Sequence, residues 1–295
     1  MVALLAPLPL ACVSAADDSV AGRIQAAYKT PLGTSACPGE DEDTAAARGA
    51  VARVRAMAGL SPLRCDGAAS LAATHHCDYV VANHVFTHVQ TPGRPEFTGV
   101  NFWDRLSVQH FTEKPSAEVL TSYSGAMAVE DAEGLVNSVY HRAPFLRGEQ
   151  TSFGYGHGRG CATIDFGRIG EAGSSDARVV WPPDGSSNVP TTFHADREVP
   201  NPLPGSVVVG SPVSLVAGGT LVDVGATLTD PSGAVLPAVL ITQATDANKL
   251  VHAGEAHLVP RAPLAANTQY VARFHGHFAK GGAFEMTTTF TTGAY

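Results

Sequence analysis

Apolar residues recur every three to four positions in two segments near the start of the chain. In TAAARGAVARVRAMAGL, the side chains of Val51, Val54 and Met57 fall on one helical face, and Gly59 follows as a helix-ending residue. A second segment, GAASLAATHHCDYVVANH, follows Asp66, whose carboxylate can accept the free amides of a first helical turn. The pattern therefore predicts two consecutive helices.

The second predicted helix has apolar residues on two sides. One stripe comprises Ala68, Leu71, Ala72, His75, Tyr79 and Ala82, and the other comprises Ala73, Cys77 and Val80. A helix with two apolar stripes packs against neighbours on two sides. We therefore expect it to lie in a core, with His75 buried on the first stripe.

Three further patterns complete this part of the chain. AVEDAEGLVNSVYH predicts a third helix that ends at His141, and QTSFGYGHGRGCATIDFG predicts two strands around a glycine-rich turn. Residues 41–170 thus mix helices with a few strands, without the regular alternation that indicates a parallel sheet. They predict a domain of the α+β class.

The composition changes in the small and polar residues 171–178, which predict a linker. Residues 179–295 then show short alternating segments separated by turn sequences such as DPSG and AKGG. In YVARFHGHF, apolar side chains alternate with Arg273, His275 and His277. Several short strands over this length predict an all-β sandwich.

Length and charge narrow the class of protein. A chain of 295 residues is long enough for two domains with separate cores. Its net charge of −8 argues against nucleic acid as a partner. No internal apolar run approaches the roughly 20 residues of a transmembrane helix.

The first residues, MVALLAPLPLACVSAADDS, form an apolar run that ends in small residues. This pattern predicts a signal peptide over residues 1–16, cut near Ala15 or Ala16, followed by an N-terminal segment over residues 17–40. The expected location is extracellular, periplasmic or at the cell surface. Cys12 raises the alternative of a lipid anchor, against which stands Pro9 in place of leucine three residues earlier.

Four cysteines remain after such a cleavage: Cys37, Cys65, Cys77 and Cys161. An even number in an oxidising location predicts two disulfides. Cys65 and Cys77 would lie roughly 15–18 Å apart along the second helix, beyond the reach of a disulfide. Two pairings stay open: Cys37–Cys65 with Cys77–Cys161, or Cys37–Cys77 with Cys65–Cys161.

Five sequence segments, in this order over residues 44–167, carry a family resemblance: RVRAMAGLSPLRCDGAASLAATHHCDYVVANHVFTH, WDRL, NSVYHRAPFL, GYGHG and IDFG. They resemble the CAP superfamily, which groups cysteine-rich secretory proteins, antigen 5 and pathogenesis-related 1, and in particular its bacterial branch. The resemblance implies an α-β-α sandwich. Residues 179–295 resemble bacterial Ig-like domains in VVWPPDGSSNVPTTF and PLAANTQYVARF, which implies a spacer or adhesive module.

The CAP resemblance also implies a cleft with two histidines and two acidic residues. The histidines correspond to His88 in VFTH and His141 in YHR, and one glutamate corresponds to Glu118 in SAEVL. The second glutamate would fall near Ser138, which cannot replace it. Glu130 and Glu133, one and two turns earlier, are weaker candidates, and both fit a solvated helix face.

Two imidazoles and a carboxylate can hold Zn²⁺ with a water in the open position. The same trio can act as general acid and base without a metal. We therefore expect a secreted, non-enzymatic binding module for a divalent metal or a small apolar ligand such as a lipid. The alternatives are a metal-dependent hydrolase acting on cell-envelope material and a structural or adhesion protein with a vestigial cleft.

Overall fold

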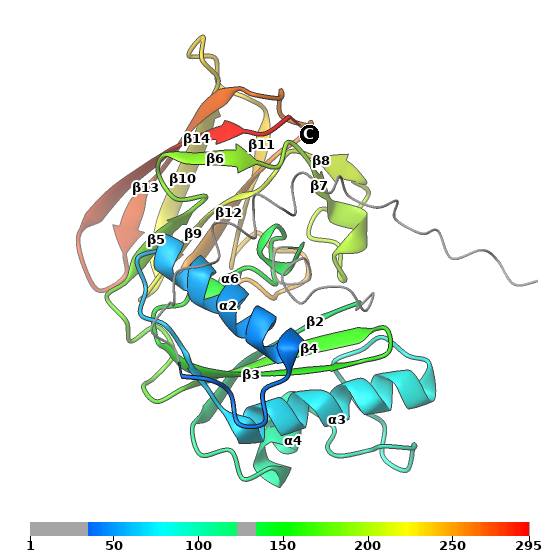
Figure 1. Cartoon of the computed structure of the whole chain (residues 1–295). Coiled ribbons are helices and arrows are strands. Elements are labelled where there is room, and N and C mark those ends of the chain that lie inside the picture. Colours follow the sequence, from blue (N-terminus) through cyan, green and yellow to red (C-terminus); the bar gives the residue numbers. More distant parts are fainter. Residues whose placement is uncertain (1–34, 123–133, 295) are drawn as a thin grey trace, which may run out of the picture. The chain divides into compact units, whose positions relative to one another are not determined.

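The structure is a computed structural model that describes residues 35–122 and 134–294 (Figure 1). The predicted signal peptide, Cys12, Glu130 and Glu133 lie outside the described residues. The N-terminal region, residues 35–168, contains the following elements: α2 (Glu42–Met57), β1 (Arg64–Cys65), α3 (Gly67–Asn83), α4 (Phe102–Val108), β2 (Lys114–Thr121), α6 (Ala143–Leu146), β3 (Gln150–Gly158) and β4 (Cys161–Arg168).

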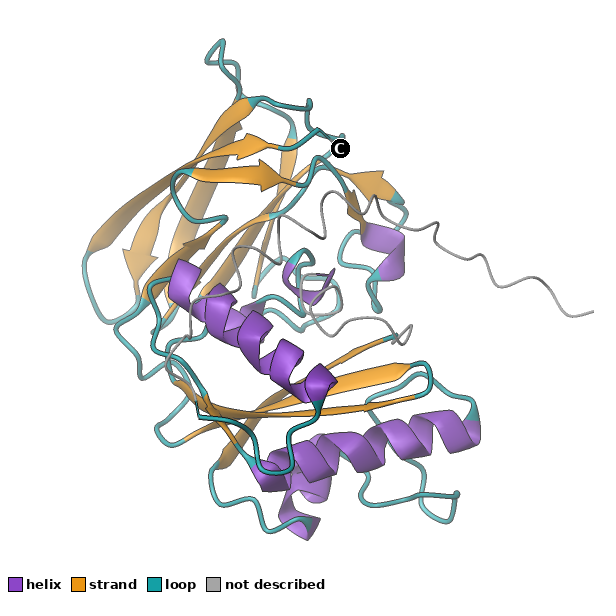
Figure 2. Ribbon diagram, in the orientation of Figure 1, coloured by secondary structure: helices purple, strands orange, loops and turns teal. Residues whose placement is uncertain are grey.

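The N-terminal region is built around one sheet with helices on both faces (Figure 2). The strand order is β1-β3-β4-β2, in which β1 runs parallel to β3 and the other pairs are antiparallel. On one face, the side chains of Phe153, Ile164 and Phe166 pack with α2 and α6 in the main hydrophobic cluster. On the other face, α3 lies against β3 and β4 and also contacts α4. This three-layer arrangement agrees with the predicted α-β-α order.

The first two helices form where the sequence pattern predicts them, but Leu71 of the predicted first stripe of α3 is 46% exposed. Val51 and Val54 are buried, whereas Met57 in the last turn of α2 is exposed. Asp66 accepts the backbone amides of Ala68 and Ala69 at 2.9 and 3.1 Å, which confirms it as the N-cap of α3.

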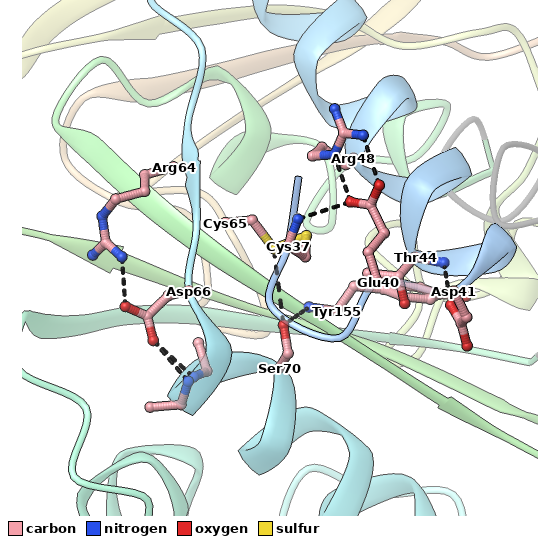
Figure 3. The surroundings of a disulfide bond; sticks show 12 residues. Cys37, Glu40, Asp41, Thr44, Arg48, Arg64, Cys65, Asp66, Ser70 and Tyr155 are labelled. Atoms are coloured by element: carbon pink, nitrogen blue, oxygen red, sulfur yellow. Dashed lines mark hydrogen bonds and ion pairs between the residues drawn. A yellow bond between two sulfur atoms is a disulfide. The ribbon is translucent and has the colours of Figure 1, made fainter. Parts of the chain in front are cut away.

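Two disulfides cross-link the N-terminal region. Cys37 is bonded to Cys65, and Cys77 is bonded to Cys161, which selects the first of the two predicted pairings. Near the first disulfide, Glu40 accepts the amide of Cys37 at 2.9 Å and binds both guanidinium nitrogens of Arg48 at 2.7 Å (Figure 3). The segment before α2 is therefore tied both to β1 and to α2 itself.

The third predicted helix does not extend to His141. Helical residues at 134–136 give way to turns at 137–142, and the short helix α6 begins only at Ala143. The backbone amides of Val139 and Tyr140 are instead bound by the carboxylate of Glu198, at 2.9 and 2.7 Å. In a continuing helix these amides would donate to backbone carbonyls of the preceding turn. Here the carboxylate of Glu198, far along the chain, accepts them instead.

The C-terminal β region, residues 178–294, contains strands and one short 3₁₀ helix. Its elements are β5 (Arg178–Trp181), β6 (Ser186–Val189), β7 (Phe193–His194), η1 (Ala195–Arg197), β8 (Val208–Val209), β9 (Val213–Ala217), β10 (Leu221–Thr229), β11 (Ala238–Thr242), β12 (Glu255–Pro260), β13 (Gln269–Phe278) and β14 (Ala283–Thr292). Two four-stranded sheets, β10-β13-β14-β6 and β11-β12-β9-β5, accompany the pair β7-β8.

One hydrophobic cluster joins the two larger sheets. Leu215 of β9 and Leu258 of β12 pack with Phe274 of β13 and Phe290 of β14. Along β13 burial alternates as predicted, and His275 and His277 lie on the exposed side. No helix within the described residues is both long and apolar enough to cross a bilayer.

Candidate functional site

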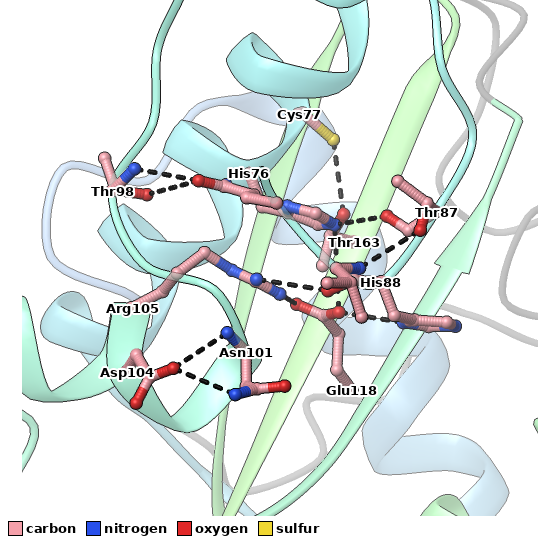
Figure 4. Close-up of polar contacts among 12 residues, drawn as sticks. His76, Cys77, Thr87, His88, Thr98, Asn101, Asp104, Arg105, Glu118 and Thr163 are labelled. Atoms are coloured by element: carbon pink, nitrogen blue, oxygen red, sulfur yellow. Dashed lines mark hydrogen bonds and ion pairs between the residues drawn. The ribbon is translucent and has the colours of Figure 1, made fainter. Parts of the chain in front are cut away.

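His88 and Glu118, which the sequence analysis places in one site, are in direct contact (Figure 4). His88 lies in the loop after α3, and its Nδ1 donates to Glu118 Oε1 at 2.8 Å. The Glu118 side chain is 1% exposed, whereas that of His88 is 44% exposed. A buried carboxylate therefore orients an imidazole that solvent and ligands can reach.

Arg105 of α4 holds both partners of this pair. Its guanidinium is buried, donates to the second carboxylate oxygen of Glu118, and donates to the carbonyl of His88 at 3.1 Å. Charge-assisted bonds of this kind are strong because both groups are removed from water. Arg105 thus fixes the side chain of Glu118 and the backbone of His88 together.

A second histidine, His76 of α3, completes the buried surroundings of Glu118. Its Nε2 lies 3.8 Å from Glu118 Oε1 and donates to the carbonyl of Thr87 at 2.9 Å. Its Nδ1 accepts from the side-chain amide of Gln90 at 3.1 Å. Burial lowers the pKa of His76 to about 4, so this imidazole is neutral at physiological pH.

Asp165 of β4 stands directly opposite Glu118 of β2 in the sheet register. Its side chain is fully buried, and burial together with the charge of Glu118 raises its pKa well above the usual range. This shift favours the protonated, neutral form of Asp165, and neither of its carboxyl oxygens has a hydrogen-bond partner among the described residues.

Glu118 takes the opposite protonation state. Burial alone would raise its pKa, but the hydrogen bond from His88 and the charge of Arg105 lower it below its usual value. Glu118 therefore remains ionised, and its charge favours the His88 tautomer with hydrogen on Nδ1. The Nε2 lone pair of His88 is then directed away from the carboxylate.

The structure places His141 in a different contact. His141 Nδ1 donates to Glu198 Oε1 at 2.8 Å, and Glu198 belongs to the C-terminal β region. The side chains of His141 and Glu198 are 15% and 2% exposed. No hydrogen bond joins His141 to His88 or Glu118 among the described residues.

The donor chemistry fits a divalent metal only in part. An imidazole whose Nδ1–H is held by a carboxylate is a common metal ligand, because the carboxylate fixes the tautomer and raises ligand basicity. However, within residues 35–122 and 134–294 no three His, Cys, Asp or Glu side chains are grouped to hold a metal ion. His88 would need water or ligand atoms to complete the coordination of Zn²⁺.

Sequence reasoning missed several members of this site and misassigned one. His76, rather than His75, is the buried histidine of α3; His75 is partly exposed, and its Nδ1 lies 3.2 Å from Gln109 Nε2. The buried stripe of α3 runs through Ala69, Ala72, Ala73, His76 and Val80. Asp165 carried a signal, since it interrupts an apolar strand in CATIDFG, whereas Glu198 carried none.

Residues 48–167 match the family model of the cysteine-rich secretory protein family, CAP. The match covers less than half of the chain and agrees with the resemblance in the sequence. No curated protein matches the chain.

Several solved structures resemble parts of the chain. An extracellular protein of Bacillus anthracis that contains an SCP domain is 23% identical over 41% of this chain, with a TM-score of 0.36, and the chain spans only 38% of that protein. An outer surface protein of Borrelia burgdorferi is 16% identical over 44% of this chain and 95% of its own, with a TM-score of 0.36. CopC of Methylosinus trichosporium is 19% identical over 39% of this chain and 88% of its own, with a TM-score of 0.26. At these TM-scores the likenesses define no function.

Proposed function

We propose that this chain is an exported CAP-domain protein that acts as a non-enzymatic binding module. The observation that carries the proposal is the exposed imidazole of His88, oriented by the buried Glu118 at 2.8 Å. Its Nε2 offers a lone pair to a divalent metal or to a hydrogen-bond donor on a small ligand. Two disulfides support an oxidising location outside the cytoplasm.

Binding is favoured over hydrolysis because an activated nucleophile is lacking among the described residues. Their four cysteines are bonded in pairs. Ser214 Oγ and His257 Nδ1 are 2.8 Å apart, but both side chains are fully buried and out of reach of a substrate. A metal-dependent hydrolase acting on cell-envelope material remains the second candidate, because His88 with Glu118 is also a general-base arrangement.

Exposed apolar residues near His88 in the sequence support the proposal that the ligand is apolar. Phe86, Val89, Phe97 and Trp103 are large apolar residues with exposed fractions of 52%, 51%, 36% and 51%. A contiguous exposed apolar patch is typical of a binding surface, and we propose that these residues form one. For the C-terminal β region we propose an Ig-like sandwich with a spacer or adhesive role toward a cell-envelope component.

The metal form is tested by loading the full chain with zinc, desalting it and measuring its zinc content. We expect about one zinc per wild-type chain and little in His88→Ala. His141→Ala reports separately on the second histidine, and His277→Ala, an exposed histidine on β13, is the matched control. Equal zinc in wild type and His88→Ala would remove the metal form.

The apolar form is tested by titration with a fluorescent fatty acid. We expect Trp103→Ser to weaken binding several-fold and His88→Ala to have a smaller effect, since apolar contact supplies most of the binding free energy. Saturable binding that is unchanged in Trp103→Ser would place the ligand elsewhere, and no binding would remove this form.

A further inference from the structure

Four consecutive residues of the CAP domain, Val139 to Arg142, are held by the C-terminal β region. Val139 lies in a hydrophobic cluster whose other buried members are Phe193, Ala195, Val209, Ile241, Val251 and Val259. Tyr140 donates its hydroxyl to Asp246 Oδ1 at 2.6 Å. Arg142 donates to the carbonyl of Pro212 at 2.7 Å and to Ser214 Oγ at 2.9 Å. This turn therefore depends on residues far along the chain.

Glu198, the residue after η1, makes the central contact. Its carboxylate accepts the backbone amides of Val139, Tyr140 and His141 at 2.9, 2.7 and 3.2 Å, and the Nδ1–H of His141 at 2.8 Å. Burial would raise the pKa of Glu198, but the hydrogen bonds from His141 and the backbone hold it below its usual value. An ionised, fully bonded carboxylate thus faces one imidazole nitrogen.

The pair His141–Glu198 repeats the geometry of His88–Glu118. In each pair Nδ1 lies 2.8 Å from a carboxylate that is at most 2% exposed. The CAP domain's own Ser138, immediately before this turn, cannot serve His141, because its hydroxyl donates to the carbonyl of Leu135 at 2.6 Å. The carboxylate that orients His141 comes instead from the other region.

We propose that Glu198 is the positioning residue of His141, so that the C-terminal β region orients a second imidazole for ligand binding. Glu198 holds the hydrogen of the neutral imidazole on Nδ1 and leaves the Nε2 lone pair for the ligand. The ligand-binding role of His141 rests on the proposed function, whereas its orientation by Glu198 does not.

The test is the tautomer of His141 in the full chain, read from long-range ¹H–¹⁵N spectra of ¹⁵N-histidine-labelled protein above about pH 8, where a free imidazole is neutral. The His141 signal is assigned with His141→Gln. In wild type we expect hydrogen on Nδ1. In Glu198→Ala we expect it to move to Nε2, the form preferred by a free imidazole. Glu198→Gln keeps an acceptor oxygen and should retain hydrogen on Nδ1.

Tyr140→Phe is the matched control, since it removes the bond to Asp246 and leaves Glu198 in place. It should lower the melting temperature without moving the hydrogen of His141. Hydrogen on Nε2 in wild type, or an unchanged tautomer in folded Glu198→Ala, would overturn the proposal. If Glu198→Ala does not fold, the proposal is still tested by the wild-type and Glu198→Gln spectra, both of which should show hydrogen on Nδ1 of His141. Because no ligand is present, a failed zinc or fatty-acid assay leaves this result unaffected.

Discussion

Asp165 and Glu118 show how two adjacent buried carboxyl groups take opposite protonation states. Glu118 has Arg105 and His88 as partners and stays ionised, whereas burial and the charge of Glu118 outweigh the charge of Arg105 at Asp165 and favour its neutral form. In the unfolded chain both groups are ionised at neutral pH. Folding must therefore add a proton to Asp165, and this proton uptake opposes folding more strongly as the pH rises.

Asp165→Asn should stabilise the protein at neutral pH. The amide is neutral and has nearly the same shape, so the variant avoids the proton uptake. We expect the free energy of unfolding at pH 7 to increase by about 2 kcal/mol, and the gain to vanish near pH 4. Urea unfolding at several pH values measures this. Asp176→Asn, at an exposed aspartate, should change little; a gain in Asp165→Asn that is independent of pH would contradict the explanation.

The sequence predicted the pair His88–Glu118 more easily than the buried residues that surround Glu118. His88 and Glu118 follow from family positions, and the structure places them in contact. The choice of His75 over His76 was wrong because both lie next to apolar stripes, and one residue rotates a side chain by about 100° around a helix. The tertiary partner decides between them: Gln90 and Thr87 bind His76 from a loop.

At the scale of elements, the glycines of β3 set how closely helix α3 approaches the sheet. A Cβ atom placed on Gly156 would lie 2.1 Å from the backbone nitrogen of Thr74, and one on Gly154 would lie 2.1 Å from that of Ser70. These are contacts with helix backbone, which cannot rotate away. The sequence GYG is therefore required by packing rather than by a turn.

Gly156→Ala should destabilise the N-terminal region, because α3 would have to move outward from β3 and β4. We expect a loss of about 3 kcal/mol in the free energy of unfolding. Gly158→Ala is the matched control two residues later, where the added Cβ would meet only Cys77 Cβ at an ordinary 3.6 Å. Thermal melting of both variants measures the difference. Equal melting temperatures would show that α3 can move away from the sheet at little cost in stability.

Elements with local signals were predictable, and elements without them were not. Helices α2 and α3 and the β3–β4 hairpin follow from periodicity, an N-cap and a glycine turn. Strand β2 has no clear alternation, and its pairing with β4 joins segments more than 40 residues apart. The end of the third predicted helix was wrong because Glu198, far along the chain, binds the amides of the turn.

At the scale of the whole molecule, one buried histidine in each region responds to acid in the same sense, which is opposite to that of Asp165. Burial lowers the pKa of His76 and of His257 to about 4. At these two histidines the unfolded chain therefore binds more protons than the folded chain between about pH 6.5 and pH 4. Glu198 and Glu255 have pKa values held below the usual range by hydrogen bonds and nearby cations despite burial, so their contribution is lost at still lower pH.

In the Asp165→Asn background, which removes the opposite response of that carboxyl, stability should accordingly fall as the pH is lowered from about 6.5 to 4, by roughly 3 kcal/mol or more. Urea unfolding at fixed temperature across this range measures the slope. His257→Gln should flatten it, whereas His277→Asn, on the exposed side of β13, should not. A stability that is constant between pH 6.5 and pH 4 would show that the two buried imidazoles are hydrated or absent from the core.

The contacts between the C-terminal β region and residues 139–147 determine when during synthesis the N-terminal region can finish folding. Arg147 binds Glu255, which is made 108 residues later, and Tyr140 binds Asp246, which is made 106 residues later. A ribosome adds about 5–20 residues per second, so these groups wait for seconds before their partners exist. During that interval the buried arginines and the turn are without their final contacts. The N-terminal region therefore completes its fold only when nearly the whole chain has been made, and a chain that stops early leaves that region unfinished as well.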